Sequence, residues 1–262
     1  MMLYQYIIKL NKGEIKKMAD SNKKALVWDK DSERCYETGV KKGVLYPKAT
    51  NGTYPLGVAW NGLSSVTETP SGAESNPIYA DDIKYVDLRS VEEFGGTIEA
   101  YTYPDEWAEC DGSAAVADGV IFGQQARKAF GLAYRTILGN DTEFEDYGYK
   151  LHLVYNALAT PSERQYQTVN DSPEAISFSW EFESTAVPVG SLGGKTLKPV
   201  SCITINSRDF TDTKKSYLEK LEEILYGKDP TSDGGEDGVA PRLPLPAEVY
   251  QILTTGKAAG EV

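Results

Sequence analysis

The chain has 262 residues, of which 40% are hydrophobic and 25% are charged, a composition typical of a globular protein and not of a disordered one. Acidic residues outnumber basic ones 39 to 27, and the net charge of −12 argues against tight binding to the nucleic-acid backbone. A single histidine excludes metal sites built on histidine pairs, the three separated cysteines form no CxxC pair, and no apolar run is long enough for a membrane-spanning helix.

Residues 1–17 come first in chain order, and they resemble a signal peptide only poorly. The apolar run at residues 3–8 is too short, the lysines follow it, and there is no small-residue cleavage site. Lys12-Gly13-Glu14 can be encoded by AAA-GGA-GAA, which contains a bacterial ribosome-binding sequence, and Met18 follows at a suitable spacing. We expect translation to start at Met18, so that 1–17 is a non-native or disordered extension; a genuine N-terminal arm is the alternative.

Alternating polar and apolar residues indicate strands in the middle of the chain. The clearest alternation covers residues 175–183, where large apolar side chains fall on one face and polar ones, such as Glu181 and Glu183, on the other. Residues 129–136 and 149–155 alternate as well, and the acidic tip 139–148 joins them into a predicted antiparallel hairpin. Further strands are expected at residues 25–28, 34–38, 56–67, 82–89, 96–103 and 197–205. Many short strands favour a mainly β fold, an antiparallel β-sandwich or barrel.

One helix is predicted, over residues 213–226, because its apolar residues form a single helical stripe. Thr211 or Asp212 can cap its start and Gly227 can end it. From about residue 228 the chain is rich in glycine, proline and aspartate and is expected to be flexible, and a short amphipathic segment follows at 247–253. No interior linker divides the chain, so residues 18–262 are expected to form a single domain with appended arms.

Two glycine-rich segments resemble ligand-binding loops but have the wrong spacing. Residues 190–196, GSLGGKT, are similar to the phosphate-binding loop GxxxxGK[ST], but position 189 is a valine and a strand-like run follows where a helix is needed. Residues 233–238 are similar to a calcium loop, but Gly235 and Pro244 stand where ligands are required. We expect a flexible hairpin or arm at the first segment and an acidic surface loop at the second.

The residues give little support for enzyme chemistry. Asp105, Glu106 and Glu109 could be the paired carboxylates of a glycosidase, but they follow Pro104 and favour a capped turn on the surface. His152 has no evident serine or cysteine partner and is expected on the surface of a strand. The expected core includes the apolar faces around three tryptophans, Trp28, Trp60 and Trp180. We therefore expect no catalytic residues, no cofactor and no metal.

Several long strings between residues 25 and 246 resemble the major tail proteins of siphophages that infect Gram-positive bacteria. Residues 25–47, 57–74 and 79–112 read ALVWDKDSERCYETGVKKGVLYP, GVAWNGLSSVTETPSGAE and YADDIKYVDLRSVEEFGGTIEAYTYPDEWAECDG. Residues 123–141 and 146–182 continue in collinear order with GQQARKAFGLAYRTILGND and DYGYKLHLVYNALATPSERQYQTVNDSPEAISFSWEF. LEKLEEILYG at 218–227 and PRLPLP at 241–246 resemble the end of the family's chains. The extension 1–17 has no expected counterpart. The loops at 190–196 and 231–238 look locally variable, so no specific role is carried over to them.

The resemblance implies a structural virion protein with an antiparallel β-sandwich of the tail-tube type, one flanking α-helix and extended loops or arms. Such proteins form hexameric rings, and the rings stack into a hollow tube that surrounds a tape-measure protein and later conducts the genome into the host. The implied partners are other copies of the chain, the tape-measure protein, the tail terminator and distal tail proteins, with transient non-specific passage of DNA and no membrane. The implied location is the virion tail, after assembly in the host cytoplasm.

Two sets of candidate residues follow from this expectation. Three glutamates on polar strand faces are candidates for a bore that repels DNA, and these are Glu99, Glu181 and Glu183. The tip of the predicted hairpin is a candidate ring-stacking loop, formed by Asp141, Thr142, Glu143, Phe144, Glu145 and Asp146.

Other functions stay open beside the tail tube. The inner tube protein of a contractile tail or injection machine has the same architecture, and a sheath gene next door would indicate it. A carbohydrate-binding or hydrolytic β-sandwich is a second alternative, suggested by the tryptophans and tyrosines, and polysaccharide binding by the monomer would favour it. A secreted adhesin is the third, and it would need a signal peptide or another export route.

Overall fold

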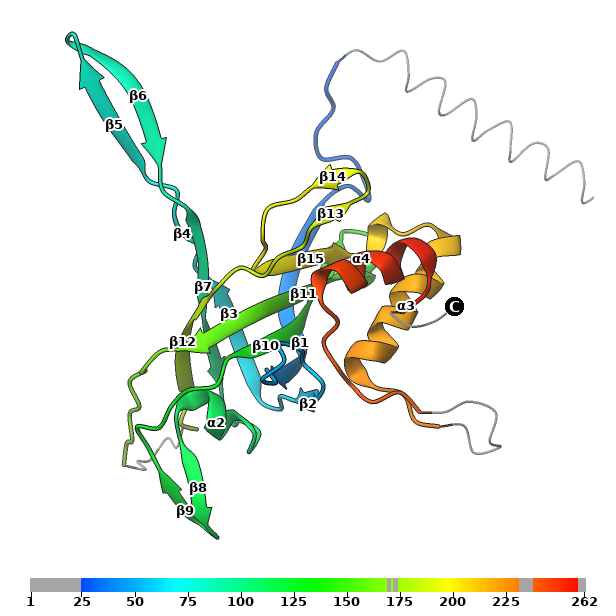
Figure 1. The fold of residues 1–262 in the computed structure, drawn as a ribbon. Helices are drawn as coiled ribbons and strands as arrows, with labels where there is room; N and C mark the ends of the chain where they lie inside the picture. Colours follow the sequence, from blue (N-terminus) through cyan, green and yellow to red (C-terminus); the bar gives the residue numbers. More distant parts are fainter. Residues whose placement is uncertain (1–24, 169–170, 172–173, 231–237, 259–262) are drawn as a thin grey trace, which may run out of the picture.

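The computed structural model describes residues 25–258 apart from 169–170, 172–173 and 231–237. The expectations for residues 1–17 and for most of the calcium-like loop lie outside the described residues. The described chain is mainly β, with antiparallel sheets and three helices (Figure 1). Its strands are β1 (Cys35–Pro47), β2 (Val58–Ala59), β3 (Leu63–Glu68), β4 (Ser71–Gly72), β5 (Ser75–Ala80), β6 (Ile83–Arg89), β7 (Glu92–Ala100), β8 (Ala114–Ala117), β9 (Val120–Phe122), β10 (Phe130–Asn140), β11 (Phe144–Ala159), β12 (Phe178–Ser184), β13 (Ser191–Leu192), β14 (Lys195–Thr196) and β15 (Cys202–Asn206). Its helices are α2 (Trp107–Asp111), α3 (Asp212–Tyr226), α4 (Pro246–Thr255) and a short 3-10 helix, η1 (Ser207–Asp209).

The main sheet has nine strands, with hydrogen-bonded neighbours in the order β2, β1, β10, β11, β12, β7 and β3. β15 adds to β11, and β4 adds to β7. The long strand β11 takes part in two layers, because residues 150–154 pair with β15 whereas residues 157–159 pair with β12. The sheet folds back over itself but does not close, so the barrel alternative of the sequence prediction is wrong.

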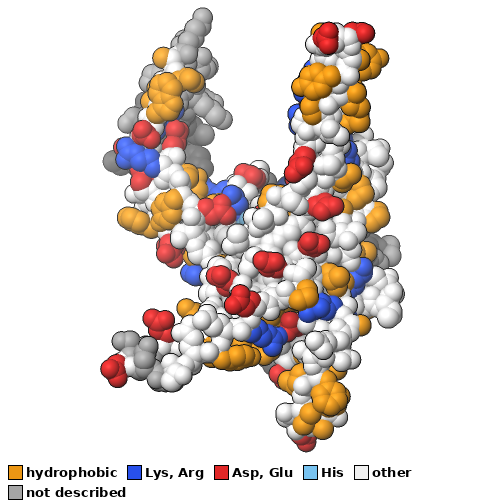
Figure 2. Space-filling model, turned by 90° about the vertical axis from the view of Figure 1, so that its left-hand side faces the viewer, with side chains coloured by type: hydrophobic (Ala, Val, Ile, Leu, Met, Phe, Trp, Pro, Cys, Tyr) orange, Lys and Arg blue, Asp and Glu red, His pale blue; other side chains and the backbone are white. Residues whose placement is uncertain are grey.

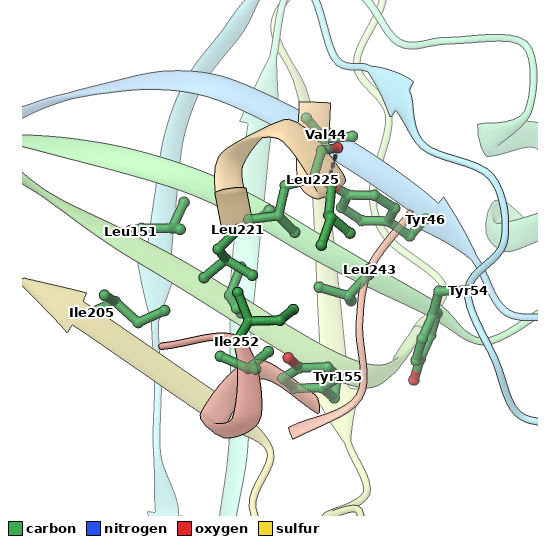
Figure 3. Close-up of a cluster of buried hydrophobic side chains, with 14 of the residues drawn as sticks. Val44, Tyr46, Tyr54, Leu151, Tyr155, Ile205, Leu221, Leu225, Leu243 and Ile252 are labelled. Atoms are coloured by element: carbon green, nitrogen blue, oxygen red, sulfur yellow. Dashed lines mark hydrogen bonds between the residues drawn. The ribbon is translucent and has the colours of Figure 1, made fainter. Parts of the chain in front are cut away.

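The helices α3 and α4 cover one face of the layer formed by β1, β10, β11 and β15. Figure 3 shows the buried apolar cluster between them, which includes Leu151, Ile205, Leu221, Leu225 and Ile252. Tyr46 of β1 donates its hydroxyl to the carbonyl oxygen of Leu225 at 2.7 Å, which satisfies the one polar atom of this buried side chain. Arg135 of β10 and Glu222 of α3 form an ion pair at 2.5 Å with both side chains mostly buried. Apolar packing and this ion pair together fix α3 on the sheet.

The strands β3, β7 and β12 cover the opposite face of β1, β10 and β11. The cluster between these layers centres on Trp60, Trp107 and Trp180, whose ring centroids lie 4.8, 5.4 and 5.7 Å apart. Trp60 donates its indole N–H to the carbonyl oxygen of Thr102 at 3.0 Å. The molecule therefore has three layers: two helices, a middle layer of β1, β10, β11 and β15, and an outer layer of β3, β7 and β12.

The prediction of a single helix is wrong, although α3 lies where that helix was expected. The helix α4 includes the amphipathic segment 247–253 and buries Val249 and Ile252, so this part of the region after residue 228 belongs to the packed body. The helix α2 stands where a surface turn was expected, and its Trp107 is fully buried. Five residues are too few for a helical period to show, which is why the sequence pattern missed α2.

The strand predictions are right in the centre of the chain and at residues 34–38, where β1 begins, but the first one, at 25–28, is wrong. Residues 25–28 lie outside every strand, and Trp28 is 73% exposed instead of buried in the core. The expected strand at 197–205 begins only at Cys202, and the one at 175–183 begins at Phe178.

The three cysteines are unpaired: Cys35 is exposed, Cys110 is buried and Cys202 is half-buried.

Two hairpins stand away from the layered body at opposite ends of the molecule (Figure 1). The longer one consists of β5 and β6, and the shorter one of β8 and β9. Their large apolar side chains are exposed, among them Ile83 at 63% and Ile121 at 62%. The sequence pattern predicted β6 as a strand but indicated neither projection.

Candidate functional site

The neighbouring strands β7 and β12 present an acidic face on the outside of the molecule. Because side chains alternate along a strand, Trp180 and Phe182 point into the core while Glu181 and Glu183 point outward. Glu99 has the same outward orientation on β7. The structure therefore brings the three candidate glutamates together on one exposed sheet face, which we call the acidic face.

The pairing of β7 with β12 keeps these carboxylates from lying directly opposite one another. It sets each glutamate against an uncharged residue: Glu99 against Ser179, Glu181 against Thr97, and Glu183 against Gly95. Like charges directly opposite each other destabilise an antiparallel pair, and the small uncharged residues avoid that arrangement. On the other side of β7, Ser65 donates its hydroxyl to Oε2 of Glu99 at 2.8 Å.

The acidic face lies on the side of the molecule away from α3 and α4. Figure 2 looks onto the left-hand side of Figure 1 and shows a band of acidic side chains across its middle, with basic ones mainly around the band. A shallow groove on this side is lined by Glu93, Glu181 and Glu183. Helix α3 packs against the other face of the middle layer, so the glutamates do not contact it.

The tip of the β10–β11 hairpin is a short turn and not the long loop that was expected over residues 139–148. β10 continues to Asn140 and β11 begins at Phe144, so only Asp141, Thr142 and Glu143 lie between the strands. Asn140 is fully buried, and its Oδ1 accepts the backbone N–H groups of Thr142 and Glu143 at 3.1 and 2.6 Å. This side-chain cap closes the turn and lets both strands run up to it.

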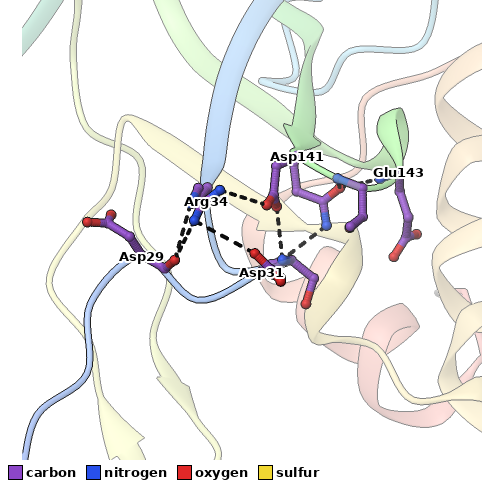
Figure 4. A network of polar contacts seen from close by, with 8 residues as sticks. Asp29, Asp31, Arg34, Asp141 and Glu143 are labelled. Carbon is purple, nitrogen blue, oxygen red and sulfur yellow. Dashed lines mark hydrogen bonds and ion pairs between the residues drawn. The ribbon is translucent and has the colours of Figure 1, made fainter.

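Asp141 binds the N-terminal segment of its own chain (Figure 4). Its Oδ1 accepts the backbone N–H of Ser32 at 2.9 Å, and its Oδ2 lies 3.6 Å from Nη1 of Arg34. Arg34 also donates to the carbonyl oxygen of Asp29 at 2.8 and 3.2 Å. Asp141 is thus occupied within the subunit. The exposed members of the predicted stacking loop are Thr142, Glu143, Phe144, Glu145 and Asp146.

The change Asp141→Ala is expected to loosen residues 25–34 with little loss of global stability. Exposed ion pairs contribute about 0–1 kcal/mol, so the free energy of unfolding should fall by no more than about 1 kcal/mol. Hydrogen exchange at Ser32 and trypsin cleavage after Arg34 should both become faster. Asp146→Ala, at an exposed position of the same hairpin, is the control. Equal exchange and cleavage in the two variants would contradict this assignment.

His152 is mostly buried among charged and aromatic neighbours instead of lying on a strand surface. Its side chain is 13% exposed, and its ring stacks on that of Tyr134 at a centroid distance of 4.7 Å. Its Nε2 lies 3.0 Å from Oγ1 of Thr136, and its Nδ1 lies 3.5 Å from Oε1 of Glu68. Burial lowers the pKa of His152, and the carboxylates of Glu68 and Glu37 oppose that shift in part. The surface prediction failed because Tyr134 of β10, Glu37 of β1 and Glu68 at the end of β3 surround the ring.

The lowered pKa of His152 predicts a loss of stability in mild acid. Below about pH 6.5 the histidine of the unfolded chain binds a proton, whereas the ring in the folded protein stays neutral. The native state therefore loses stability as the pH falls, until the pH is below the pKa of His152 in the folded protein. His152→Gln removes this titration and keeps a partner for Thr136. Its free energy of unfolding, measured with denaturant, should therefore change less than that of the parent between about pH 7 and about pH 5.5. The same pH dependence in both proteins would contradict the prediction.

Glu37 gives an internal check on this experiment, because it titrates in a different range. Burial raises the pKa of Glu37, but hydrogen bonds from Lys150 and Thr136 outweigh burial and lower it overall. Stability that depends on its ionised form is present at neutral pH and is lost only as the pH falls below 4.5, the ordinary value for glutamate. The acid transition that remains in His152→Gln should lie in that lower range.

The other candidate ligand segments form ordinary structure. Residues 190–196 contain the short hairpin β13–β14, and no helix opens after Thr196. Trp60, Trp107 and Trp180 are buried and cannot stack on a sugar, whereas Trp28 is exposed. Within the described ranges, no group of three or more histidine, cysteine or acidic side chains could hold a metal ion.

A scan against models of protein families finds no match, and a search of curated proteins finds none either. In the part of the chain that the structure describes, no helix has both the length and the hydrophobicity needed to cross a bilayer. Function is therefore inferred from the residues and their geometry.

Proposed function

We propose that the chain is the subunit of a phage tail tube, in which hexameric rings stack around a bore that carries the genome. The observation that carries the proposal is the acidic face, on which Glu99, Glu181 and Glu183 stand among small uncharged residues. DNA has about one negative charge per 1.7 Å of helix axis, so a basic bore would hold it by counterion release whereas an acidic one lets it slide. The strings between residues 25 and 246 that resemble siphophage major tail proteins support the same function.

Free strand edges offer a way to close the ring. On the described chain, β15 pairs only with β11, and residues 35–41 of β1 pair only with β10. Unpaired backbone groups on such edges are a template for another chain. Because β15 and β1 are the two outer strands of the middle layer, β15 of one subunit can pair with β1 of the next, and the repeated contact closes a ring. With α3 and α4 on the outside of that ring, the acidic face lies toward the bore.

The remaining partners follow from this arrangement. The tape-measure protein occupies the bore during assembly in the host cytoplasm, and the tail terminator and distal tail proteins bind the two ends of the tube. The chain is then a structural protein of the virion tail with no enzymatic step of its own.

Electron microscopy of the purified full chain tests the proposal. We expect six-fold rings or hollow tubes at high protein concentration, and the same rings in mature tails. A protein that remains monomeric at high concentration, together with tails that lack such rings, would contradict it. Binding of a polysaccharide by the monomer would instead favour the carbohydrate-binding alternative.

Phe144 offers a test of the stacking role proposed for the exposed residues of the β10–β11 tip. Its side chain is 67% exposed, and its φ of 52° is a left-handed conformation that a bulky residue adopts at a cost. Phe144→Gly is expected to leave the subunit folded and at least as stable, because glycine adopts this φ freely, while tubes become shorter. Thermal melts and micrographs measure the two effects. Tubes of normal length would contradict a stacking role for Phe144.

A further inference from the structure

The β5–β6 hairpin has one polar face and one apolar face. Its strands are joined by Asp81 and Asp82, both with positive φ, as a two-residue hairpin turn requires. Pairing sets Ile78 opposite Val86 and Ala80 opposite Ile83, with Leu88 and its partner Asn76 on the same side. All of these residues except the uncharged Asn76 are apolar, and they form the apolar face. Each of the larger side chains is at least 39% exposed.

The polar face of the same hairpin is held together by its own contacts. Asp87 accepts hydrogen bonds from the Ser75 hydroxyl at 2.5 Å and from the Lys84 ammonium at 2.8 Å. Apolar and polar residues therefore alternate as they do in a strand pair that buries one face. In the isolated subunit, however, nothing covers the apolar face. A two-stranded hairpin in water is marginally stable at best, so this one needs a surface to cover its apolar face.

The β8–β9 hairpin at the other end of the molecule has a matching surface. Its strands contain only alanine, valine, isoleucine and phenylalanine, and its one charged residue, Asp118, lies in the turn with Gly119. Val116, Ile121 and Phe122 are each more than half exposed. Neither this hairpin nor the apolar face of β5–β6 brings a charge to the contact, so the two can pack together without leaving a charge unpaired.

We infer that the apolar face of the β5–β6 hairpin binds the β8–β9 hairpin of a second copy of the chain. The two hairpins project from opposite ends of one subunit (Figure 1), so a contact between them is heterologous, head to tail, and repeats without closing. One type of contact then covers both exposed apolar surfaces of every subunit inside the stack. The inference rests on the proposed function and assigns this contact to the junction between successive rings.

Disulfide cross-linking of the full chain tests the inference. In a Cys35→Ser background, Val86→Cys and Ile121→Cys each add one exposed thiol, on β6 and β9. Mild oxidation of the double variant should give a ladder of covalent oligomers, and a mixture of the two single variants should give dimers. Each single variant alone should give no dimers. Val86→Cys combined with Glu219→Cys, an exposed position on α3 away from both hairpins (Figure 1), is the control and should give no ladder.

A second pair of variants separates stacking from ring formation. Ile78→Glu with Val86→Glu places charges on the apolar face and should yield folded rings that do not stack. Tyr79→Glu places a charge on the polar face, opposite Lys84 at a 67% exposed position, and should leave tubes intact. Tubes without the cross-link would overturn the inference and leave the proposed function standing. Dimers formed by Val86→Cys alone would also overturn it, because they would show that the β5–β6 hairpin binds the β5–β6 hairpin of another copy. A protein that remains monomeric at high concentration, together with tails that lack such rings, contradicts both.

Discussion

Replacing Glu181 and Glu183 together by lysine is expected to slow or stall the ejection of DNA while the tubes still form. Both side chains are exposed and point away from the core, so their exchange should not unfold the subunit. In the proposed bore each lysine adds about one phosphate contact per subunit, and the contacts repeat around every ring and along the tube. Each contact alone is weak, but passing DNA then has to break many of them at once.

Salt provides the diagnostic for this effect. The Debye length falls from about 30 Å at 0.01 M to about 8 Å at 0.15 M, so ejection should be slowest at low salt and recover as salt is added. Glu219→Lys with Asp209→Lys makes the same change in charge at exposed positions of α3 and η1, and it should eject DNA normally. Ejection at the parental rate in low salt from the Glu181 and Glu183 variant would show that these residues do not face the DNA.

Trp180→Ala should produce a large loss of stability, because it removes the centre of the tryptophan cluster. Trp180 is 1% exposed and packs against Trp60, Trp107 and Phe178. Truncating a buried tryptophan to alanine costs about 3–5 kcal/mol, because the surrounding layers close only part of the cavity. For a chain of this size the corresponding fall in Tm is about 10 °C.

Trp28→Ala is the matched control, since it makes the same chemical change at a site that is 73% exposed. Its free energy of unfolding should stay within about 0.5 kcal/mol of the parent. Denaturant unfolding followed by far-ultraviolet circular dichroism measures both variants without relying on tryptophan fluorescence, which the substitutions alter. Equal losses in the two variants would mean that the tryptophan cluster does not hold the outer layer on the sheet.

Strand β12 could be predicted from sequence because it is half-buried, and a half-buried strand shows its period of two directly. Strand β10 is buried on both faces, and its period showed because large apolar residues alternate with mostly small ones. The alternation along β12 assigned Glu181 and Glu183 to a polar face. It could not show that Glu99 lies on the same face, because the pairing of β7 with β12 joins segments far apart in the chain and depends on tertiary packing.

The missed features have physical reasons as well. Asp81-Asp82 lacks the glycine of a strong hairpin signal, although aspartate tolerates the positive φ that the turn needs. The alternation of apolar and polar residues on both sides of this pair was therefore the available signal for β5–β6. Trp28 was assigned to the core because a hydrophobic side chain does not reveal which surface covers it. Asp141 was assigned to an open loop because its partner Ser32 lies 109 residues away in the sequence, and the asparagine at position 140 was the available local signal for a short turn.

The free edge of β1 carries a cysteine whose reactivity can report ring closure. Cys35, at the first residue of that edge, is the exposed thiol, whereas Cys110 is buried and Cys202 is half-buried. Burial also raises the pKa of Cys110 to about 12, so only a very small fraction of this thiol is in the reactive thiolate form at neutral pH. A maleimide added to the unmodified protein should thus label Cys35 first in free subunits. If β15 of a neighbour covers the edge, the same residue becomes unreactive as each ring closes, and the kinetics of assembly can be followed from the unlabelled fraction.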